Sequence, residues 1–454
     1  MTTLCDPNVR DVQEKQVSLL PGESRIREYA LIGETKYSCV LPNGFSVFVV
    51  PKSGFQKRYA LLATDYGSAD RRFRFGGNMV ETPEGVAHFL EHLMFETELG
   101  SASTILSENG ASSNAYTSTD ITAYNIECVD NFTDNLETLL KFVSIPYFTQ
   151  RSVDKERGII GQEILMVMDD PDYRLYYGLM KSLFRHSPLR ESVAGTTGSI
   201  SKITADNLYD CHKSFYTPSN MALCVAGDVT PEEIADVARS VLPPEPGEIP
   251  RRDYGPGETP EPERKRISEA MDVNLPIFMA GCKTGPADDG PDNLRLEIVS
   301  ALALDILAGH SSPLYFRLYG QGLVNNDFSA LFDSSSGAAY VLFGGETRDP
   351  DRVFDEVNKE IARISENGPD EGLFERVKKA AAGSFIRSLN SFDAICGGII
   401  CGHFRGYDVF DTPDVLSGIT ENDITTFLRE RLISDNMAIS IIYPNDNTEI
   451  ITGG

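Results

Sequence analysis

Residues 87–93 read Ala87-His88-Phe89-Leu90-Glu91-His92-Leu93. On a helix, residues four apart lie on one face, so His88 and His92 would point the same way with Glu91 beside them. Two imidazoles suit zinc, and a neighbouring carboxylate that does not bind the metal can take a proton from zinc-bound water. The order H-x-x-E-H reverses the commoner H-E-x-x-H. The stretch therefore predicts a zinc site with Glu91 as general base.

The sequence around this motif predicts a helix. Thr82 is a suitable N-cap, Pro83 fits the first helical position, and 86–93 contains apolar residues for the buried face. Three matched positions can occur by accident. The chain has only six His among 454 residues, however, and two of them are in the motif, which argues against accident.

Composition excludes several classes of protein. A net charge of −26 argues against binding to nucleic acid, although it is compatible with cationic or peptide partners and most simply serves solubility. No apolar run approaches the roughly 18 residues of a membrane span. Residues 1–28 lack the apolar core of a signal peptide. The eight cysteines include no C-x-x-C pair, which favours reduced, buried thiols. We therefore expect a cytoplasmic, membrane-free protein.

The chain contains one domain twice. Residues 203–208 align with 419–424, and 220–223 align with 436–439, both at an offset of 216 (419 − 203 and 436 − 220). Between the copies, 242–263 is rich in Pro, Gly and Glu and is typical of a linker. The predicted domains are a zinc-binding peptidase domain at 1–241, the linker at 242–263, and an inactive homologous domain at 264–454.

The same offset shows which copy carries the metal. His88, Glu91 and His92 fall on apolar residues in the second copy, namely Leu304, Leu307 and Ala308. The second domain thus keeps the helix without its chemistry. It would serve as a wall of the substrate chamber and as a dimerisation surface.

Strands and helices mix without strict alternation, which predicts an α+β fold with antiparallel pairing. Strands are predicted at 37–41, 45–51, 58–66 and 121–127, with a turn at Pro42-Asn43-Gly44, and helices at 133–143, 152–168 and 230–242.

A zinc site needs a further protein ligand, and the predicted helix 152–168 offers Glu156 and Glu163. They are two turns apart, about 10 Å along the axis, so they cannot both bind one ion. One would be a ligand and the other would hydrogen-bond a ligating imidazole. Alternatively both face solvent, since Lys155 and Arg157 flank Glu156 as in an ordinary surface pair.

Three segments, 85–95, 114–124 and 154–164, resemble the pitrilysin/insulinase (M16) family of zinc peptidases. The separation of 71 residues from His92 to Glu163 (163 − 92) is also similar. The resemblance implies that Glu163 is the third zinc ligand and that Glu156 is the supporting carboxylate. It implies two homologous α/β-sandwich domains, each a half-bowl of the LuxS/metallopeptidase-like kind. Residues 169–174 and the chain length resemble the bacterial short-chain subgroup (M16B), which includes mitochondrial processing peptidase.

The resemblance also implies that an edge strand beginning near Asn114 pairs with extended substrate. Asn114, Ala115 and Tyr116 would then contact the peptide beside the scissile bond. The alternative for these residues is a structural turn that leads from a loop into a strand.

One departure from the family concerns an Arg and a Tyr seven residues apart that complete the site from the second domain. Anchored on Arg317, the Tyr position holds Val324; anchored on 322–323, the pair becomes Leu318 and Asn325. Neither alignment keeps the Tyr, so Arg317 alone remains as a substrate-binding candidate. This implies that a homologous subunit lacking H-x-x-E-H supplies the pair in a heterodimer, with a homodimer as the alternative.

The resulting hypothesis is a zinc metalloendopeptidase that cleaves extended or unfolded peptides, in leader or precursor processing or in peptide turnover. A non-catalytic scaffold or chaperone-like subunit of a peptidase complex is the main alternative, and the intact set of His88, Glu91, His92 and Glu163 argues against it. A zinc hydrolase of small molecules would not need a duplicated, chamber-sized architecture.

Overall fold

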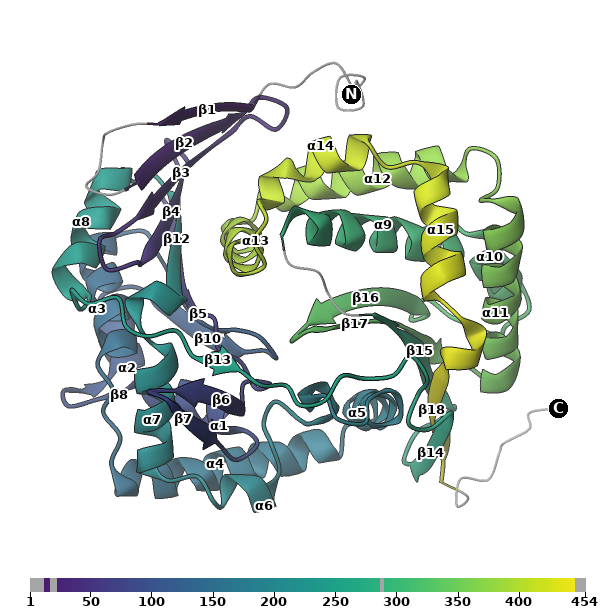
Figure 1. The fold of residues 1–454 in the computed structure, drawn as a ribbon, viewed down its shortest axis with the longest axis horizontal. Helices are drawn as coiled ribbons and strands as arrows, with labels where there is room; N and C mark the ends of the chain where they lie inside the picture. Colours follow the sequence, from purple (N-terminus) through teal and green to yellow (C-terminus); the bar gives the residue numbers. More distant parts are fainter. Residues whose placement is uncertain (1–11, 17–22, 286–289, 446–454) are drawn as a thin grey trace. The chain divides into compact units, whose positions relative to one another are not determined.

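The computed structural model of the protein describes residues 12–16, 23–285 and 290–445 (Figure 1). These residues form two compact units, and neither is continuous in sequence. Unit 1 takes in the chain up to Ile164 together with Ser192–Tyr254 and Ser384–Ser417. Unit 2 takes in Leu165–Glu191, Gly255–Gly383 and the chain from Gly418 onward. The sequence boundaries 1–241, 242–263 and 264–454 describe the duplication and stay a prediction.

Unit 1 is built on an eight-stranded sheet with the order β1-β2-β3-β4-β12-β5-β11-β10. All neighbours are antiparallel except β4 and β12, which run parallel. Four strands match those predicted from the sequence, β3, β4, β5 and β11. The bounds are β1 Val12–Gln16, β2 Glu23–Tyr29, β3 Glu34–Val40, β4 Ser46–Pro51, β5 Arg58–Thr64, β10 Ser112–Thr117, β11 Thr122–Cys128 and β12 Met221–Gly227.

Alternate residues of these strands bury the two faces of the sheet in different cores. Leu62 and Leu223 face a core lined by several helices, while their neighbours Leu61 and Cys224 face helix α13 (Phe392–Phe404). Three of these helices agree with predicted ones or extend them, namely α3, α4 and α8. The helices that line this first core include α1 Val86–Met94, α2 Ala102–Glu108, α3 Phe132–Ser144, α4 Gln150–Met168, α7 Ala205–Phe215 and α8 Pro231–Val241.

Unit 2 repeats the last five strands of this sheet order. Its order β14-β18-β15-β17-β16 corresponds to β4-β12-β5-β11-β10, including the single parallel pair, here β14 with β18. The α+β architecture with two homologous domains is therefore confirmed. The strands are β14 Arg266–Met271, β15 Ile277–Gly285, β16 Ser329–Ser335, β17 Ala338–Glu346 and β18 Ala438–Pro444.

Each unit includes helical residues from a distant part of the sequence. Helix α5 (Pro171–Leu183) precedes the linker but packs in unit 2, where Leu179 and Leu183 contact Tyr340 and Leu342. Helix α13 lies near the C-terminus but packs in unit 1. The other helices of unit 2 are α9 Pro291–Ala308, α10 Pro313–Gly320, α11 Pro350–Asn367, most of α12 Leu373–Ser388 and α15 Glu421–Arg431. The end of α12 and helix α14 Thr412–Ser417 belong to unit 1.

The predicted start of the motif helix is wrong. Helix α1 begins at Val86 after an N-cap at Gly85, whose φ of 85° is left-handed, rather than at Thr82 and Pro83. Thr82 instead closes a hairpin, because its N–H donates to Arg71 O at 2.9 Å. A Cβ at position 85 would lie 2.5 Å from Ala194 O, so only glycine fits this turn.

The hairpin before α1 belongs to a small sheet of order β13-β6-β7, with β6 at Arg72–Phe75, β7 at Asn78–Glu81 and β13 at Arg251–Arg252. Strand β13 comes from the segment predicted to be a linker, so part of that segment is paired in the sheet of unit 1. Within the described residues, no helix is long and apolar enough to cross a membrane.

A comparison of two glycines with similar φ separates the effect of the close contact at Gly85 from the effect of its backbone conformation. Gly77 has a φ of 80° with nothing within 4 Å of an added Cβ, whereas Gly85 has a φ of 85° and the close contact to Ala194 O. We expect Gly77→Ala to lower the free energy of unfolding by about 1–2 kcal/mol, the cost of a left-handed residue. Gly85→Ala should cost clearly more, measured by denaturant unfolding. Equal losses would show that Gly85 does not fix the start of α1.

Candidate active site

Helix α1 buries almost all of its surface and leaves its two histidines toward the site. Phe89, Leu90 and Leu93 are fully buried in the core of unit 1, and full burial of such a side chain contributes about 1.5–3 kcal/mol. His88 and His92 lie one turn apart on the other face, with ring centroids 4.6 Å apart. The packing of the apolar face thus sets the direction of both imidazoles.

Helix α4 brings the acidic residues to α1. Its buried stripe, Val153, Ile160 and Ile164, packs into the same core. Glu156 belongs to this buried side and is 8% exposed, whereas the side chain of Glu163 is 35% exposed on the flank. The two glutamates are therefore not equivalent, and neither is a solvent-facing surface residue.

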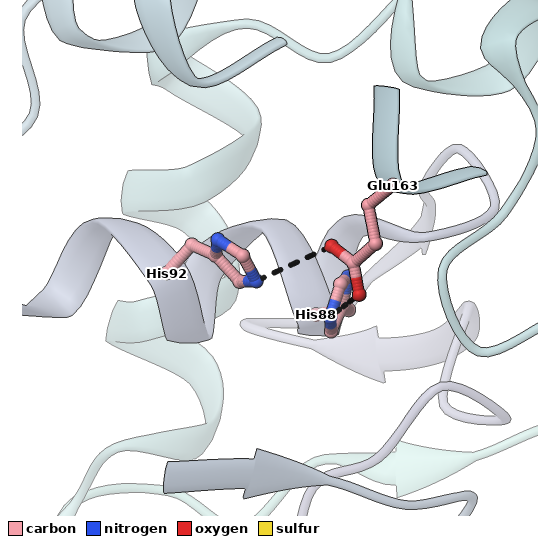
Figure 2. A group of neighbouring side chains, drawn as sticks. All are labelled: His88, His92 and Glu163. Atoms are coloured by element: carbon pink, nitrogen blue, oxygen red, sulfur yellow. Dashed lines mark ion pairs between the residues drawn. The ribbon is translucent and has the colours of Figure 1, made fainter. Parts of the chain in front are cut away.

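His88, His92 and Glu163 converge on one point (Figure 2). Glu163 Oε1 lies 3.7 Å from His88 Nε2, and Glu163 Oε2 lies 3.7 Å from His92 Nε2. One ligand atom from each residue falls within 4.8 Å of the others. Ligand atoms about 2.0–2.2 Å from a shared zinc ion are separated by distances of this order. Two nitrogens and one carboxylate oxygen thus fit a zinc ion with an open fourth position.

Glu156 lies behind the cluster and contacts only one imidazole. Its Oε1 is 2.9 Å from His92 Nδ1, so the ring N–H can donate to it while Nε2 faces Glu163. A carboxylate in this place fixes the ring orientation of a ligating histidine. The geometry therefore favours Glu163 as the ligand and Glu156 as the support.

The surroundings shift the pKa values of the two histidines in opposite directions. Burial, together with His92, lowers the pKa of His88 to about 4, which keeps its imidazole neutral as metal binding requires. Burial also acts to lower the pKa of His92, but its hydrogen bond to Glu156 and the charge of Glu91 outweigh burial and raise this pKa. His88 Nδ1 is buried without a hydrogen-bond partner among the described residues.

Glu91 lies on the same helix but outside the ligand cluster. Its carboxylate is 8% exposed and accepts a hydrogen bond from Thr117 Oγ1 at 2.9 Å. Burial raises the pKa of Glu91, and the hydrogen bond from Thr117 and the nearby His92 partly oppose this rise. A carboxylate with a raised pKa beside a metal position can act as a general base.

The predicted substrate-binding residues lie on β10, which is the last strand of the eight-stranded sheet. An edge strand has backbone groups free to pair with another strand. Asn114 is exposed and its Oδ1 accepts from Ala115 N–H at 2.9 Å, while Tyr116 is 40% exposed. The predicted position of the edge strand is therefore correct, although the strand starts two residues earlier, at Ser112.

The residues aligned with the family's Arg/Tyr pair lie in unit 2. Arg317, on α10, donates to the buried carboxylate of Glu360 at 2.8 Å. Leu318 is fully buried, and the Asn325 amide donates to Glu346 at 3.0 Å. Whether Arg317 contacts substrate stays a prediction.

Two matches to known families cover most of the chain. Residues 76–197 match Insulinase (Peptidase family M16), and residues 202–381 match the Peptidase M16 inactive domain. A Bacillus subtilis protein named "Uncharacterized zinc protease YmfH" is 38% identical over 424 residues, which cover 92% of this chain and 98% of that protein. The chain belongs to peptidase family M16.

Two further M16 relatives show that similarity extends over most of the chain. A solved structure of an M16-like peptidase from Alicyclobacillus acidocaldarius has a TM-score of 0.86 and 35% identity, covering 94% of this chain and all of that one. Mitochondrial-processing peptidase subunit beta of Neurospora crassa is 25% identical and covers 81% of both chains. The predicted resemblance to short, M16B-like members is thus confirmed.

Thr117 was missed by the sequence analysis, although it lies in one of the segments that carry the resemblance. In a strand, side chains alternate, so Thr117 faces the same side as Ala115. That side was predictable from the sequence. The contact with Glu91 was not, because it depends on how α1 packs against β10.

The two glutamates of α4 should respond differently to the same substitution. We expect Glu163→Gln to abolish stoichiometric zinc binding, because it removes a charged ligand. Glu156→Gln should weaken zinc affinity by about 10–100-fold, as loss of a supporting carboxylate usually does. Metal analysis and titration against a chromophoric chelator measure both. Loss of zinc only from Glu156→Gln would reverse the two roles.

Proposed function

We propose that this chain is a zinc-dependent metalloendopeptidase that cleaves extended or unfolded peptides. The observation that carries the proposal is the cluster of His88, His92 and Glu163 with ligand atoms within 4.8 Å, next to a buried carboxylate that is not part of it. Zinc sites with three protein ligands keep a position for water or substrate and are typical of catalysis. The similarity to proteins named zinc proteases supports the same function.

The protein's own residues have distinct roles in this mechanism. A zinc ion held by His88, His92 and Glu163 would supply Lewis acidity for water and for the scissile carbonyl. Glu91 accepts the proton of the attacking water and returns it to the leaving amine. Glu156 keeps the Nε2 of His92 directed at the metal position through its contact with Nδ1.

The substrate would bind along β10. Backbone pairing with an edge strand selects an extended peptide and is largely independent of its sequence. Asn114, Ala115 and Tyr116 lie on that strand, which also carries Thr117 beside Glu91. Recognition of peptide backbone next to the general base favours a peptidase over a hydrolase of small molecules.

We further propose that a homologous subunit lacking H-x-x-E-H completes the site. Leu318 is buried in a core and Asn325 is engaged by Glu346, so neither provides the Arg or Tyr of the family's pair. The Neurospora crassa relative is named as one subunit of mitochondrial-processing peptidase, which supports a heterodimer in this family. A homodimer is the alternative.

A cytoplasmic location fits the cysteines. None of the seven cysteines in the described part of the chain forms a disulfide, and six are buried, as expected for a reducing compartment.

Substitution of the general base tests the function directly. We expect Glu91→Gln to keep one zinc per chain, because Glu91 is not a ligand, and to lose about 10²–10⁴-fold in turnover. Cleavage of a quenched peptide library and metal analysis measure the two quantities. Glu96→Gln, which alters a glutamate just beyond α1 that pairs with Lys155, is the matched control and should leave both unchanged. Loss of zinc together with activity would refute the assignment, and inactivity of every preparation would favour a scaffold.

The missing Tyr of the family's pair generates a prediction about assembly. We expect the isolated chain to bind zinc and peptide but to turn over slowly, because one absent oxyanion donor costs about 10²–10³-fold in rate. Addition of the homologous subunit should restore the rate.

Full activity of a homogeneous preparation without that subunit would contradict the heterodimer and favour a homodimer. Tyr319, which is 52% exposed, would then be tested first as a replacement donor, because the hydroxyl of Tyr315 already contacts Asn326.

A further inference from the structure

Thr117 is the residue that contacts Glu91 from outside its helix. Its hydroxyl donates to Glu91 Oε2 at 2.9 Å, and among the described residues no other hydrogen bond reaches this carboxylate. Thr122 Oγ1 lies 3.5 Å from Thr117 Oγ1, but the hydroxyl proton of Thr122 is donated to Tyr66 O at 2.9 Å. Because Thr122 can therefore only accept, the shorter contact assigns the proton of Thr117 to Glu91.

The end of β10 that carries Thr117 rests against a second turn, which contains Gly67, Ser68 and Ala69. The residues after Thr117 form a turn to β11, and this turn accepts two backbone hydrogen bonds. Ser68 N–H donates to Ser118 O at 2.9 Å, and Ala69 N–H donates to Thr119 O at 3.1 Å. A Cβ on Gly67 would lie 2.2 Å from Thr119 O, so the two turns touch without room for a side chain.

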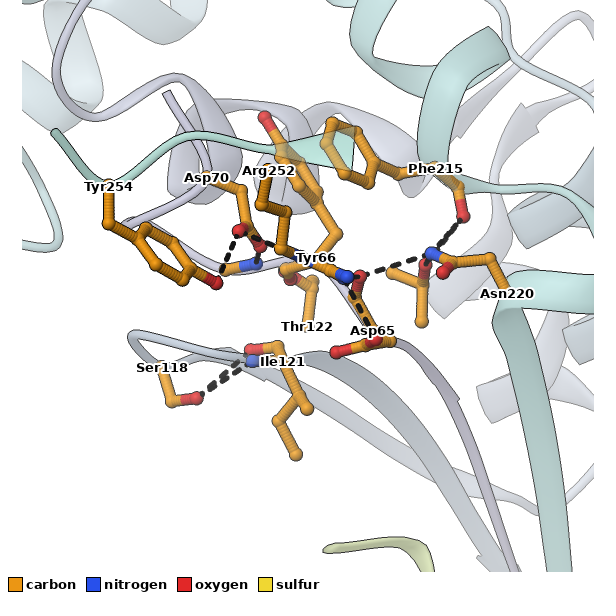
Figure 3. A network of polar contacts seen from close by, with 12 residues as sticks. Asp65, Tyr66, Asp70, Ser118, Ile121, Thr122, Phe215, Asn220, Arg252 and Tyr254 are labelled. Atoms are coloured by element: carbon orange, nitrogen blue, oxygen red, sulfur yellow. Dashed lines mark hydrogen bonds and ion pairs between the residues drawn. The ribbon is translucent and has the colours of Figure 1, made fainter. Parts of the chain in front are cut away.

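A buried ion pair fixes this second turn (Figure 3). The carboxylate of Asp70, which is 1% exposed, accepts from Gly67 N–H at 2.9 Å, Arg252 Nε at 2.9 Å and Tyr254 OH at 3.0 Å. Arg252 also pairs with Asp65 at 2.9 Å. Arg252 lies on β13, so a residue of the predicted linker holds the turn against which the end of β10 rests.

We propose that Thr117 is a positioning residue for Glu91, and that the Asp70–Arg252 pair holds the strand end from which Thr117 acts. The proposal rests on the proposed peptidase function, in which Glu91 is the general base. A carboxylate on a flexible side chain has several rotamers, and a second contact selects one of them. Misplacement of a catalytic group by about 1 Å can reduce a rate by about 100-fold.

The direct test compares Thr117→Val with Thr117→Ser in the zinc-loaded chain. We expect Thr117→Val to lower kcat by roughly 10–100-fold, with KM unchanged within about twofold and zinc content intact. Thr117→Ser should recover most of the loss, because it restores the hydroxyl. Thr133→Val is the matched control, since Thr133 donates to Glu233 at 2.8 Å between α3 and α8; it should leave kcat unchanged. Wild-type kcat in Thr117→Val would overturn the proposal.

The remote part is tested by Arg252→Lys, which keeps the charge but cannot contact Asp65 and Asp70 with the same planar fork. We expect a smaller loss of kcat, and the double variant with Thr117→Val should be no slower than Thr117→Val alone. Arg74→Lys, at an exposed position of the neighbouring strand β6, is the control. Independent, multiplying losses would show that the ion pair does not act through Thr117.

A third measurement does not depend on activity. In the zinc-loaded full-length chain, the unfolding midpoints of Glu91→Ala, Thr117→Val and the double variant report whether the two side chains interact. Non-additive shifts support the contact, and additive shifts overturn it. If the wild-type chain with its candidate partner cleaves no peptide, the proposed function fails and the catalytic reading of Thr117 fails with it, while the midpoints still decide the contact.

Discussion

The separation between α1 and α4 is the constraint on which the site depends. His88 and His92 come from one helix, so its pitch of 5.4 Å fixes their spacing wherever the helix packs. Glu163 comes from another helix, and its two oxygens must reach both imidazoles, as they do at 3.7 Å. Only packing sets that distance. The buried stripe of α4 and the fully buried side chains of α1 share one core, and this core holds Glu163 beside the two histidines.

The parts of the fold that follow local rules were predictable, and those set by packing were not. The pair of His88 and His92, the turn before β4 and the duplication are written in the spacing of residues along the chain. The predicted start of α1 is wrong because the N-cap at Gly85 is set by its close contact with the carbonyl oxygen of Ala194, a residue far away in sequence, and not by its sequence neighbours. The places of α5 and α13 in the other half's unit, and the contact of Thr117 with Glu91, depend on residues far apart in sequence. The spacing of residues along the chain does not show which distant segments pack together.

The two units show how one scaffold can be kept while its chemistry is lost. Both use the same five-strand order with one parallel pair. In unit 2 the positions of the metal motif are Leu304, Leu307 and Ala308, and all three are buried in α9. In unit 1 the equivalent side chains are only partly buried histidines and a buried glutamate. Apolar replacements need no partner, whereas a buried carboxylate such as Glu91 costs stability unless hydrogen bonds and nearby charge compensate it.

That cost gives a physical reason for the hydrogen bond between Glu91, the proposed general base, and Thr117 at the sheet edge. A base for water attack must be ionised near neutral pH and still attract a proton, so its pKa has to be raised only moderately. Burial raises the pKa of Glu91, and the hydrogen bond from Thr117 opposes the rise. The donor sits on β10, the edge strand of the same sheet. In the proposed function, β10 would therefore pair with an extended peptide through its edge, while its Thr117 side chain contacts Glu91. A shift of β10 would then change the register of the bound peptide and the orientation of Glu91 together, because both depend on the same short segment.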